Sequence, residues 1–228
     1  KGDHLIEIGP GPGALTALLR PLPWERLLLI EKDDSYAGGH AAHPLPGLEV
    51  WHGDALAFDW RGLTGAWKII GNLPYNIASP LMWDIASTVC CLERAVFMVQ
   101  KEVAERLLSP PGRKAYGALT AWIRNFCDVA RGFDVPPCCF SPPPKVDSAV
   151  IVFTSRPYVR RPPHPDRLSF LLKLCFGQRR KQLHGILRSC FGESKTLMAL
   201  QKTAIQGSLR PESLTPEQFA ELSEHLFY

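Results

Sequence analysis

Short apolar runs alternate with longer segments along the first two-thirds of the chain. The runs occupy residues 4–8, 26–30, 48–51, 67–70, 94–99 and 149–154, and Gly, Pro, Asn or Asp residues bound them. Their length is typical of buried strands. The intervening segments 14–19, 79–91, 101–108 and 116–127 are long enough for helices. This alternation predicts an α/β fold whose sheet is mainly parallel.

The pattern changes after residue 155. Residues 156–165 are rich in Arg and Pro and are typical of a linker, and helices are predicted over residues 166–176, 179–190, 194–205 and 216–227. Thr215 stands where it can cap the last helix, and Glu217 and Glu221 early in that helix favour its dipole. We therefore expect two domains, residues 1–155 and a small helical domain over residues 156–228.

Composition and hydropathy exclude several classes of protein. The 228 residues are 46% hydrophobic and 21% charged, which is ordinary for a globular protein. The longest uncharged stretch, residues 69–83, is shorter than the ~20 residues of a membrane-spanning helix. We see no secretory leader and expect a cytoplasmic protein that does not enter a membrane. The chain begins with Lys1 and not with Met, so we expect that upstream residues are missing.

Neither the cysteines nor the histidines predict a structural site. Cysteine occurs 7 times, an odd number, and without a C-x-x-C motif, so reduced thiols are expected. The 7 histidines are scattered without the spacing of metal ligands. We therefore expect no metal.

Positive charge is concentrated in the second part of the chain. The whole protein has a net charge of +4, yet residues 156–210 contain 12 basic and 2 acidic residues. A local excess of this size favours binding to a polyanion such as nucleic acid. A solvated helical surface explains the charge equally well.

Glycines and acidic residues follow the first three predicted strands. Gly9, Gly11 and Gly13 separate the first strand from a helix, with spacing G-x-G-x-G rather than the dinucleotide fingerprint G-x-G-x-x-G. Glu31 ends the next strand, where a carboxylate can accept hydrogen bonds from ribose hydroxyls. Asp54, after the third strand, can accept from an adenine amino group or cap a helix. These features favour an adenosine-containing cofactor without choosing between NAD and S-adenosylmethionine.

The segment Asn72-Leu73-Pro74-Tyr75 ends the fourth predicted strand and indicates the chemistry. An exocyclic adenine amine is a poor nucleophile because its lone pair is conjugated with the ring. The Asn72 side-chain oxygen and the carbonyl of Leu73 or Pro74 can accept hydrogen bonds from the two N–H groups of this amine. These acceptors stabilise the charge that develops on its nitrogen. Tyr75 can stack on the base and align it with a methyl donor. The motif therefore favours methylation of an adenine amine.

Together these segments resemble the ribosomal RNA adenine dimethyltransferases, the KsgA-like family. The resemblance rests on E-I-G-P-G-P-G-A-L-T, Glu31, G-D-A-L, N-L-P-Y-N-I-A-S-P-L, and on F-S-P-P-P-K-V-D-S-A-V at residues 140–150. It implies a Rossmann-like S-adenosylmethionine-dependent methyltransferase sheet in residues 1–155 and a basic helical RNA-binding domain in residues 156–228. The implied reaction is N6-dimethylation of two adjacent adenosines near the 3′ end of small-subunit (16S-type) ribosomal RNA, in a pre-ribosomal particle.

The resemblance also implies roles for individual residues, which group by ligand. The cofactor is expected at Gly9, Gly11, Gly13, Glu31, Asp54 and Asn72, and the flipped target adenine at Asn72, Leu73, Pro74, Tyr75 and Phe140. Tyr75 and Phe140 would sandwich the base and return part of the cost of unstacking it. RNA phosphates are expected at Arg179, Arg180 and Lys181, which we place at a helix start. The family's Q-N-F-L motif upstream of the glycines is absent, so cofactor binding by this chain could be weak.

Two other functions stay open at this point, and a third is less favoured. The erythromycin-resistance methylases use the same chemistry on large-subunit RNA. A non-catalytic assembly factor or RNA-binding protein could keep the fold, although the intact Asn72, Pro74 and Tyr75 argue against it. A DNA adenine methylase usually has D-P-P-Y or N-P-P-Y, which Leu73 does not match. We expect a monomer that acts on small-subunit ribosomal RNA.

Overall fold

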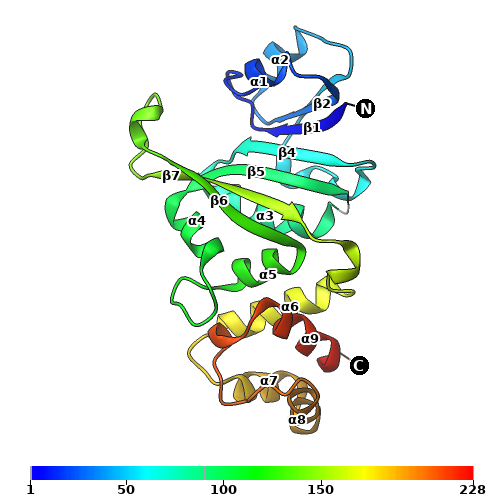
Figure 1. The fold of residues 1–228 in the computed structure, drawn as a ribbon, viewed down its shortest axis with the longest axis vertical. Helices are drawn as coiled ribbons and strands as arrows, with labels where there is room; N and C mark the ends of the chain where they lie inside the picture. Colours follow the sequence, from blue (N-terminus) through cyan, green and yellow to red (C-terminus); the bar gives the residue numbers. More distant parts are fainter. Residues whose placement is uncertain (1, 90, 228) are drawn as a thin grey trace. The chain divides into compact units, whose positions relative to one another are not determined.

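A computed structural model describes residues 2–89 and 91–227, which form one sheet and a group of helices (Figure 1). Within this part of the chain the sheet has seven strands in the order β3-β2-β1-β4-β5-β7-β6. The strands are β1 (Asp3–Ile8), β2 (Trp24–Glu31), β3 (Leu48–His52), β4 (Trp67–Asn72), β5 (Leu92–Gln100), β6 (Cys127–Val135) and β7 (Ser148–Ser155).

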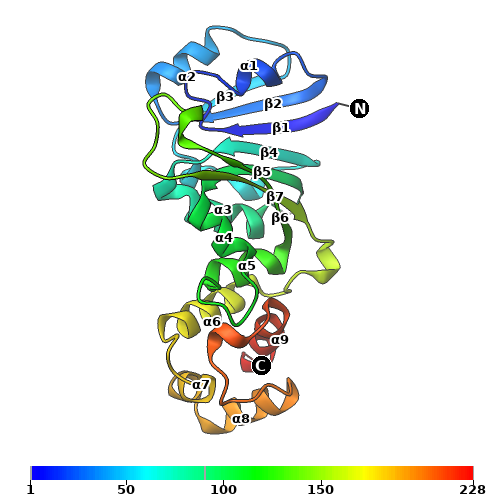
Figure 2. The ribbon, with the colours of Figure 1, turned by 60° about the vertical axis from the view of Figure 1, so that its left-hand side comes forward.

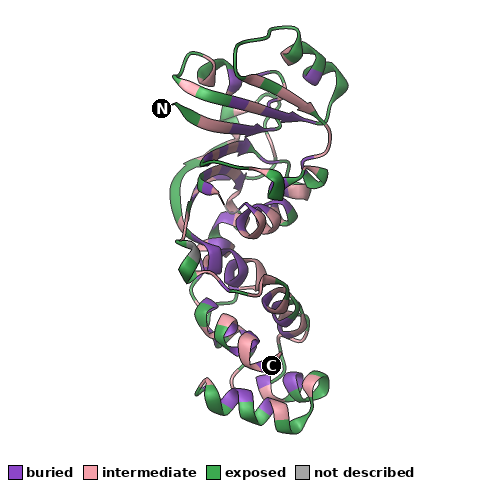
Figure 3. Ribbon diagram, turned by 90° about the vertical axis from the view of Figure 1, so that its right-hand side faces the viewer, coloured by how far each residue is buried: buried purple, intermediate pink, exposed green. Residues whose placement is uncertain are grey.

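The central strands run in one direction. β1 pairs in parallel with β2 and β4, β2 with β3, and β4 with β5, whereas β7 is antiparallel to β5. Their side chains are largely apolar, and Ile6, Leu27, Ile69 and Phe97 are fully or almost fully buried. Strands that are covered on both faces need such continuous apolar runs. The prediction of a mainly parallel α/β sheet is therefore confirmed, and Figure 3 shows the buried centre of its strands.

Helices and strands alternate as far as β5, and a run of helices follows the last strand, β7 (Figure 2). The α-helices are α1 (Thr16–Leu19), α2 (Asp34–Ala41), α3 (Tyr75–Thr88), α4 (Lys101–Leu108), α5 (Ala118–Phe126), α6 (Pro165–Gly177), α7 (Leu183–Phe191), α8 (Glu193–Lys202) and α9 (Pro216–Leu226). Short 3₁₀ turns lie between them, among them η1 (Ala55–Ala57) and η3 (Pro137–Cys139). α2 packs against β2 and β3, and α3 packs against β5.

Two elements lie where the sequence patterns gave no element. α2 was not expected, and β6 occupies residues that followed the predicted helix over 116–127. α7 begins at Leu183, so the basic residues 179–181 lie in the turn between α6 and α7 and not at a helix start. By contrast, Thr215 caps α9 through a capping box in which its hydroxyl accepts from the Gln218 N–H.

The chain divides into two compact units, and their boundary differs from the expected one. The first unit contains residues 1–104 and 129–155, and the second contains residues 105–128 and 156–228. Residues 105–128 belong with the second unit because α5 packs against α6 and α9. The buried Asn125 amide also donates to the Pro216 carbonyl at 3.0 Å. A segment predicted to belong to residues 1–155 is thus part of the helical core.

The described residues contain neither a membrane span nor a metal site. No helix there has the length and apolar character to cross a bilayer. The same residues contain no group of three His, Cys, Asp or Glu side chains placed to hold a metal ion.

Candidate active site

The glycine loop after β1 has a backbone that only glycine adopts readily. Gly9, Gly11 and Gly13 have φ of +66°, +52° and +91°, in the left-handed region. A Cβ placed on Gly9 or Gly11 would meet no heavy atom within 4 Å. The loop therefore presents bare backbone to open space, as a loop that contacts a ligand must.

Hydrogen bonds fix both ends of this loop. The Gly9 N–H donates to the Ile30 carbonyl at 2.9 Å, which ties the loop to the end of β2. The Thr16 hydroxyl, after the loop, donates to the Glu7 Oε2 atom before it at 2.7 Å. Glu7 is 1% exposed, and burial raises the pKa of its carboxyl, partly offset by the Thr16 hydrogen bond. The loop is thus closed at its base by a buried side-chain pair.

Glu31, at the end of β2, faces the glycine loop. Its carboxylate accepts from the backbone N–H of Gly11 at 2.8 Å, of Lys32 at 2.8 Å and of Asp33 at 2.9 Å. An ionised carboxylate offers about four acceptor sites. About one acceptor site is therefore left for a ligand hydroxyl. Independent hydrogen bonds from both ribose hydroxyls would require two such sites.

Asp54 lies just beyond β3 and has two partners. Its Oδ1 atom accepts from the Leu56 N–H at 3.0 Å and caps η1, and its Oδ2 atom accepts from the Lys32 ammonium at 2.8 Å. The hydrogen bond from Lys32 lowers the pKa of Asp54. The helix-cap interpretation of Asp54 is therefore confirmed, and an adenine contact stays a prediction.

The segment after β4 combines an exposed amide with a fixed backbone. Asn72 is exposed, and Leu73 is buried and donates its N–H to the Met98 carbonyl at 3.2 Å. The Pro74 carbonyl accepts from the N–H groups of Ile77 at 3.1 Å and Ala78 at 3.0 Å, in the first turn of α3. Its acceptor capacity is thereby used, so of the two carbonyls left open by the sequence, that of Leu73 is better suited to receive an adenine N–H.

Tyr75 is the first residue of α3 and is 40% exposed. Its hydroxyl lies 3.2 Å from the hydroxyl of Ser148, a buried residue at the start of β7. Phe140 follows η3 and is half-buried, and its N–H donates to the Pro137 carbonyl. No interaction described for these residues joins the Phe140 ring to Tyr75, so the aromatic sandwich stays a prediction.

Strand register brings the predicted cofactor residues to one edge of the sheet. Ile8, the last residue of β1, pairs with Ile30 on one side and Gly71 on the other. The residues that follow Ile8, Ile30 and Gly71 along the chain are Gly9, Glu31 and Asn72. All three therefore lie at the carboxyl ends of neighbouring parallel strands, where open α/β sheets bind ligands.

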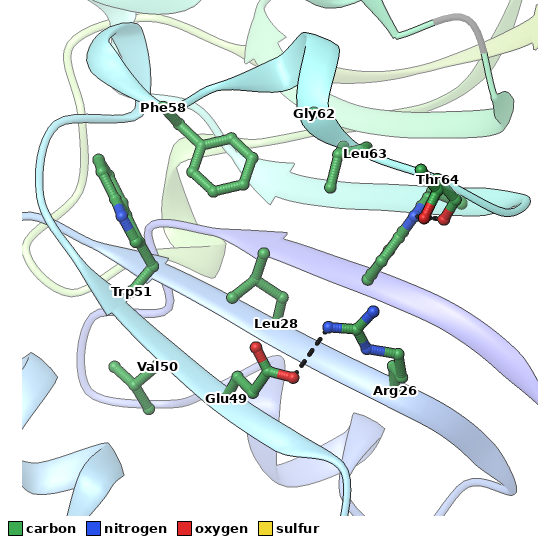
Figure 4. A pocket seen from close by; sticks show the side chains of 10 residues that line it. Arg26, Leu28, Glu49, Val50, Trp51, Phe58, Gly62, Leu63 and Thr64 are labelled. Carbon is green, nitrogen blue, oxygen red and sulfur yellow. Dashed lines mark hydrogen bonds and ion pairs between the residues drawn. The ribbon is translucent and has the colours of Figure 1, made fainter.

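A pocket elsewhere in the first unit contains none of the predicted site residues. It has a volume of about 270 Å³ and lies over β2 and β3 (Figure 4). Trp51, Phe58 and Leu28 line it beside an Arg26–Glu49 ion pair of 2.9 Å. The candidate site is thus defined by strand ends and loop geometry, and not by this pocket.

Two residues that contact the site were not among the predicted site residues. His40 in α2 lies 2.8 Å from the Gly11 carbonyl through its Nε2 atom. Ser148 holds the Tyr75 hydroxyl. Only the proximity of elements distant in sequence identifies either of them.

The three basic residues between α6 and α7 differ in their surroundings. Arg179 is half-buried, and its Nε atom donates to the Glu212 Oε2 atom at 2.5 Å. Arg180 is exposed, and the exposed Lys181 donates to the neutral Gln178 side chain at 2.9 Å. Among the three, Arg179 has a charge that is already compensated.

Solved structures define the class of the fold. A dimethyladenosine transferase from Plasmodium falciparum superposes with a TM-score of 0.82 at 28% identity, covering 96% of this chain and 88% of that one. The 23S rRNA methyltransferase ErmE superposes with a TM-score of 0.69 at 24% identity, covering 100% and 93%, a likeness that shows the fold alone. The fold is that of the Rossmann-like, S-adenosylmethionine-dependent methyltransferases.

Sequence comparison identifies the family. A family model described as ribosomal RNA adenine dimethylase matches residues 1–227. Ribosomal RNA small subunit methyltransferase A of Nitratidesulfovibrio vulgaris is 50% identical over 227 residues, covering 97% of this chain and 85% of the relative. The enzyme of the same name from Lawsonia intracellularis is 43% identical, covering 98% and 83%. The chain belongs to the ribosomal RNA adenine dimethylase family.

Proposed function

We propose that this protein uses S-adenosylmethionine to dimethylate the N6 atoms of two adjacent adenosines near the 3′ end of small-subunit ribosomal RNA. Asn72 carries the proposal, because its exposed amide ends β4, which pairs with the strand that leads into the glycine loop. The two relatives above, at 43% and 50% identity, bear the name of a small-subunit enzyme. Their names favour the small subunit over the large-subunit reaction.

The residues present fit an adenosine-containing cofactor. The bare backbone at Gly9 and Gly11 leaves room for a ligand, and the Glu31 carboxylate beside it keeps about one acceptor site for a ribose hydroxyl. Asp54 lies one strand further and retains lone pairs for an adenine amine. When bound, S-adenosylmethionine supplies an electrophilic methyl group. This chain's residues hold and orient the two reactants.

Asn72 and Leu73 would prepare the adenine amine. The Asn72 side-chain oxygen accepts one N–H of the amine and the Leu73 carbonyl accepts the other. The Leu73 backbone is fixed by its hydrogen bond to the Met98 carbonyl, so the Leu73 carbonyl is oriented before the base arrives. Positive charge that develops on the amine nitrogen is stabilised by these dipoles. No strong base is required, since the amine proton becomes acidic only as the bond to carbon forms.

Tyr75 and Phe140 would hold the flipped base by stacking. The Ser148 contact fixes the Tyr75 hydroxyl, so the ring is oriented at little further entropic cost on binding. Exposed cations of the second unit, Arg180 and Lys181, would bind backbone phosphates of the RNA. We propose that the protein does so as a cytoplasmic monomer on a pre-ribosomal particle.

Methyl transfer from labelled S-adenosylmethionine to unmethylated small and large ribosomal subunits tests the proposal. We expect label in small-subunit adenosines only. The Asn72→Ala variant should lose transfer while it still binds RNA, because Asn72 contacts the amine and not the phosphates. Label in the large subunit, or equal loss of transfer and RNA binding in Asn72→Ala, would contradict it.

A further inference from the structure

The His40 ring from α2 touches the glycine loop at two places. Its Nε2 atom lies 2.8 Å from the Gly11 carbonyl oxygen. Its Cε1 atom lies 3.1 Å from where a Cβ of Gly13 would stand. The ring is half-buried, so part of its surface packs and does not face solvent.

The peptide groups of Gly11 are held from opposite directions. The Gly11 N–H donates to the Glu31 carboxylate at 2.8 Å, and the Gly11 carbonyl is bonded to His40. A carbonyl oxygen only accepts, so the His40 Nε2 atom carries the hydrogen and donates it. Helix α2 and strand β2 therefore hold Gly11 between them through these two hydrogen bonds.

These two hydrogen bonds act in the middle of the loop, between the two ends that the Glu7–Thr16 pair holds together. Gly9 and Gly11 have no Cβ, and no heavy atom beyond their chain neighbours lies within 4 Å of where theirs would be. Glycine loses more conformational freedom on ordering than any other residue. A mobile loop would lose that entropy on binding a ligand, whereas a loop that is already held loses less.

We propose that His40 is a positioning residue for the cofactor, which acts by holding the Gly11 carbonyl and with it the glycine loop. This inference rests on the proposed function, because it takes S-adenosylmethionine as the ligand of that loop. His40 does not touch the reacting atoms in this role. Its substitution should weaken cofactor binding and leave RNA binding unaltered.

Three substitutions separate the hydrogen bond from the bulk of the ring. In His40→Gln, the amide nitrogen is as many bonds from Cα as Nε2 is, so it can reach the Gly11 carbonyl. In His40→Asn, the amide nitrogen stands near the position of Nδ1, so the side chain is too short to reach the Gly11 carbonyl. His40→Leu keeps volume but has no donor. Dissociation constants for S-adenosylmethionine and S-adenosylhomocysteine are measured by calorimetry on the 228-residue protein without RNA, alongside KM for RNA.

We expect His40→Leu and His40→Asn to raise the dissociation constant for S-adenosylmethionine about fivefold, because a loop that is no longer held loses roughly one residue's backbone entropy on binding, with KM for RNA unchanged. His40→Gln should bind like the unaltered protein. Hydrogen exchange in residues 9–16 should be faster in the Asn and Leu variants than in the Gln variant.

Equal binding by all four proteins would overturn the inference, as would a His40→Gln variant as weak as His40→Asn. The Gln and Asn variants are both small and polar, so their comparison stays decisive where His40→Leu fails to fold. Failure of the unaltered protein to bind S-adenosylmethionine would refute the proposed function itself, and the inference with it.

Discussion

Neutralising Arg179 separately from Arg180 and Lys181 should distinguish a structural cation from RNA-binding ones. Arg179 is paired with Glu212, and its side chain is 32% exposed, whereas Arg180 and Lys181 are exposed and lack an acidic partner among the interactions of the described residues. A cation whose charge is already compensated within the protein contributes less binding free energy when it contacts a phosphate. Substitution of Arg180 or Lys181 with Gln should therefore weaken RNA binding. Substitution of Arg179 with Gln should instead reduce the stability of the fold.

The magnitudes follow from these surroundings. Removing one phosphate interaction reduces the slope of log K against log salt by about 0.7–0.9. The double variant Arg180→Gln, Lys181→Gln should thus lower the slope by about 1.4–1.8 and leave unfolding unchanged. Arg179→Gln should keep the slope and reduce stability by about 1 kcal/mol, because its ion pair is only partly buried. For a chain of this length that change lowers Tm by about 2–4 °C.

The assay is anisotropy of a fluorescent small-subunit RNA fragment over a salt series, with thermal unfolding in parallel. Glu212→Gln is the matched control, since it breaks the same ion pair but leaves every cation in place. It should reduce stability as Arg179→Gln does and show no smaller slope. A slope reduced as much by Arg179→Gln as by Arg180→Gln would refute the reasoning.

Three further predictions concern the polar groups of Tyr116, Tyr75 and Glu7. Tyr116→Phe should stabilise the protein by about 1 kcal/mol, because its fully buried hydroxyl has no hydrogen-bond partner in the described structure. Tyr75→Phe should reduce methyl transfer far less than Tyr75→Ala, because it keeps the ring and removes only the Ser148 hydrogen bond. Burial raises the folded-state pKa of Glu7 above its ordinary 4.5, so stability falls as pH rises from 4.5 through the raised value. Glu7→Gln keeps an acceptor for Thr16 and should flatten this decline.

Denaturant unfolding and single-turnover transfer check these three outcomes. A less stable Tyr116→Phe would show that the hydroxyl has a partner. Equal methyl transfer by the two Tyr75 variants would show that stacking by the Tyr75 ring does not contribute to the reaction. An unchanged pH dependence in Glu7→Gln would show that the Glu7 carboxyl is not the group that titrates.

Much of the first unit could be predicted because its strands are short apolar runs between turn residues. β6 was missed because most of its residues are exposed and several are charged, so neither an apolar run nor an alternation identifies it. α2 was missed because Gly38 and Gly39 lie within it. It forms through tertiary packing and an N-cap, in which the Asp33 side chain accepts from the Ser35 and Tyr36 N–H groups.

The site was predictable to the extent that strand ends converge. Gly9, Glu31 and Asn72 follow paired strands, so their proximity could be inferred from the motifs and the parallel sheet. The sequence does not determine which polar groups already have hydrogen-bond partners within the protein. The Pro74 carbonyl, the Glu31 carboxylate and the Arg179 guanidinium all have partners set by the folded backbone or by distant residues.

Mass-spectrometric mapping of the methylated nucleosides tests the central claim most directly. Unmethylated small subunits would be treated with the protein and S-adenosylmethionine, and their RNA digested and sequenced by fragment mass. The account predicts N6,N6-dimethyladenosine at two adjacent positions near the 3′ end, and none in subunits treated with Asn72→Ala. Methylation at another base or atom, or no methylation at all, would contradict it.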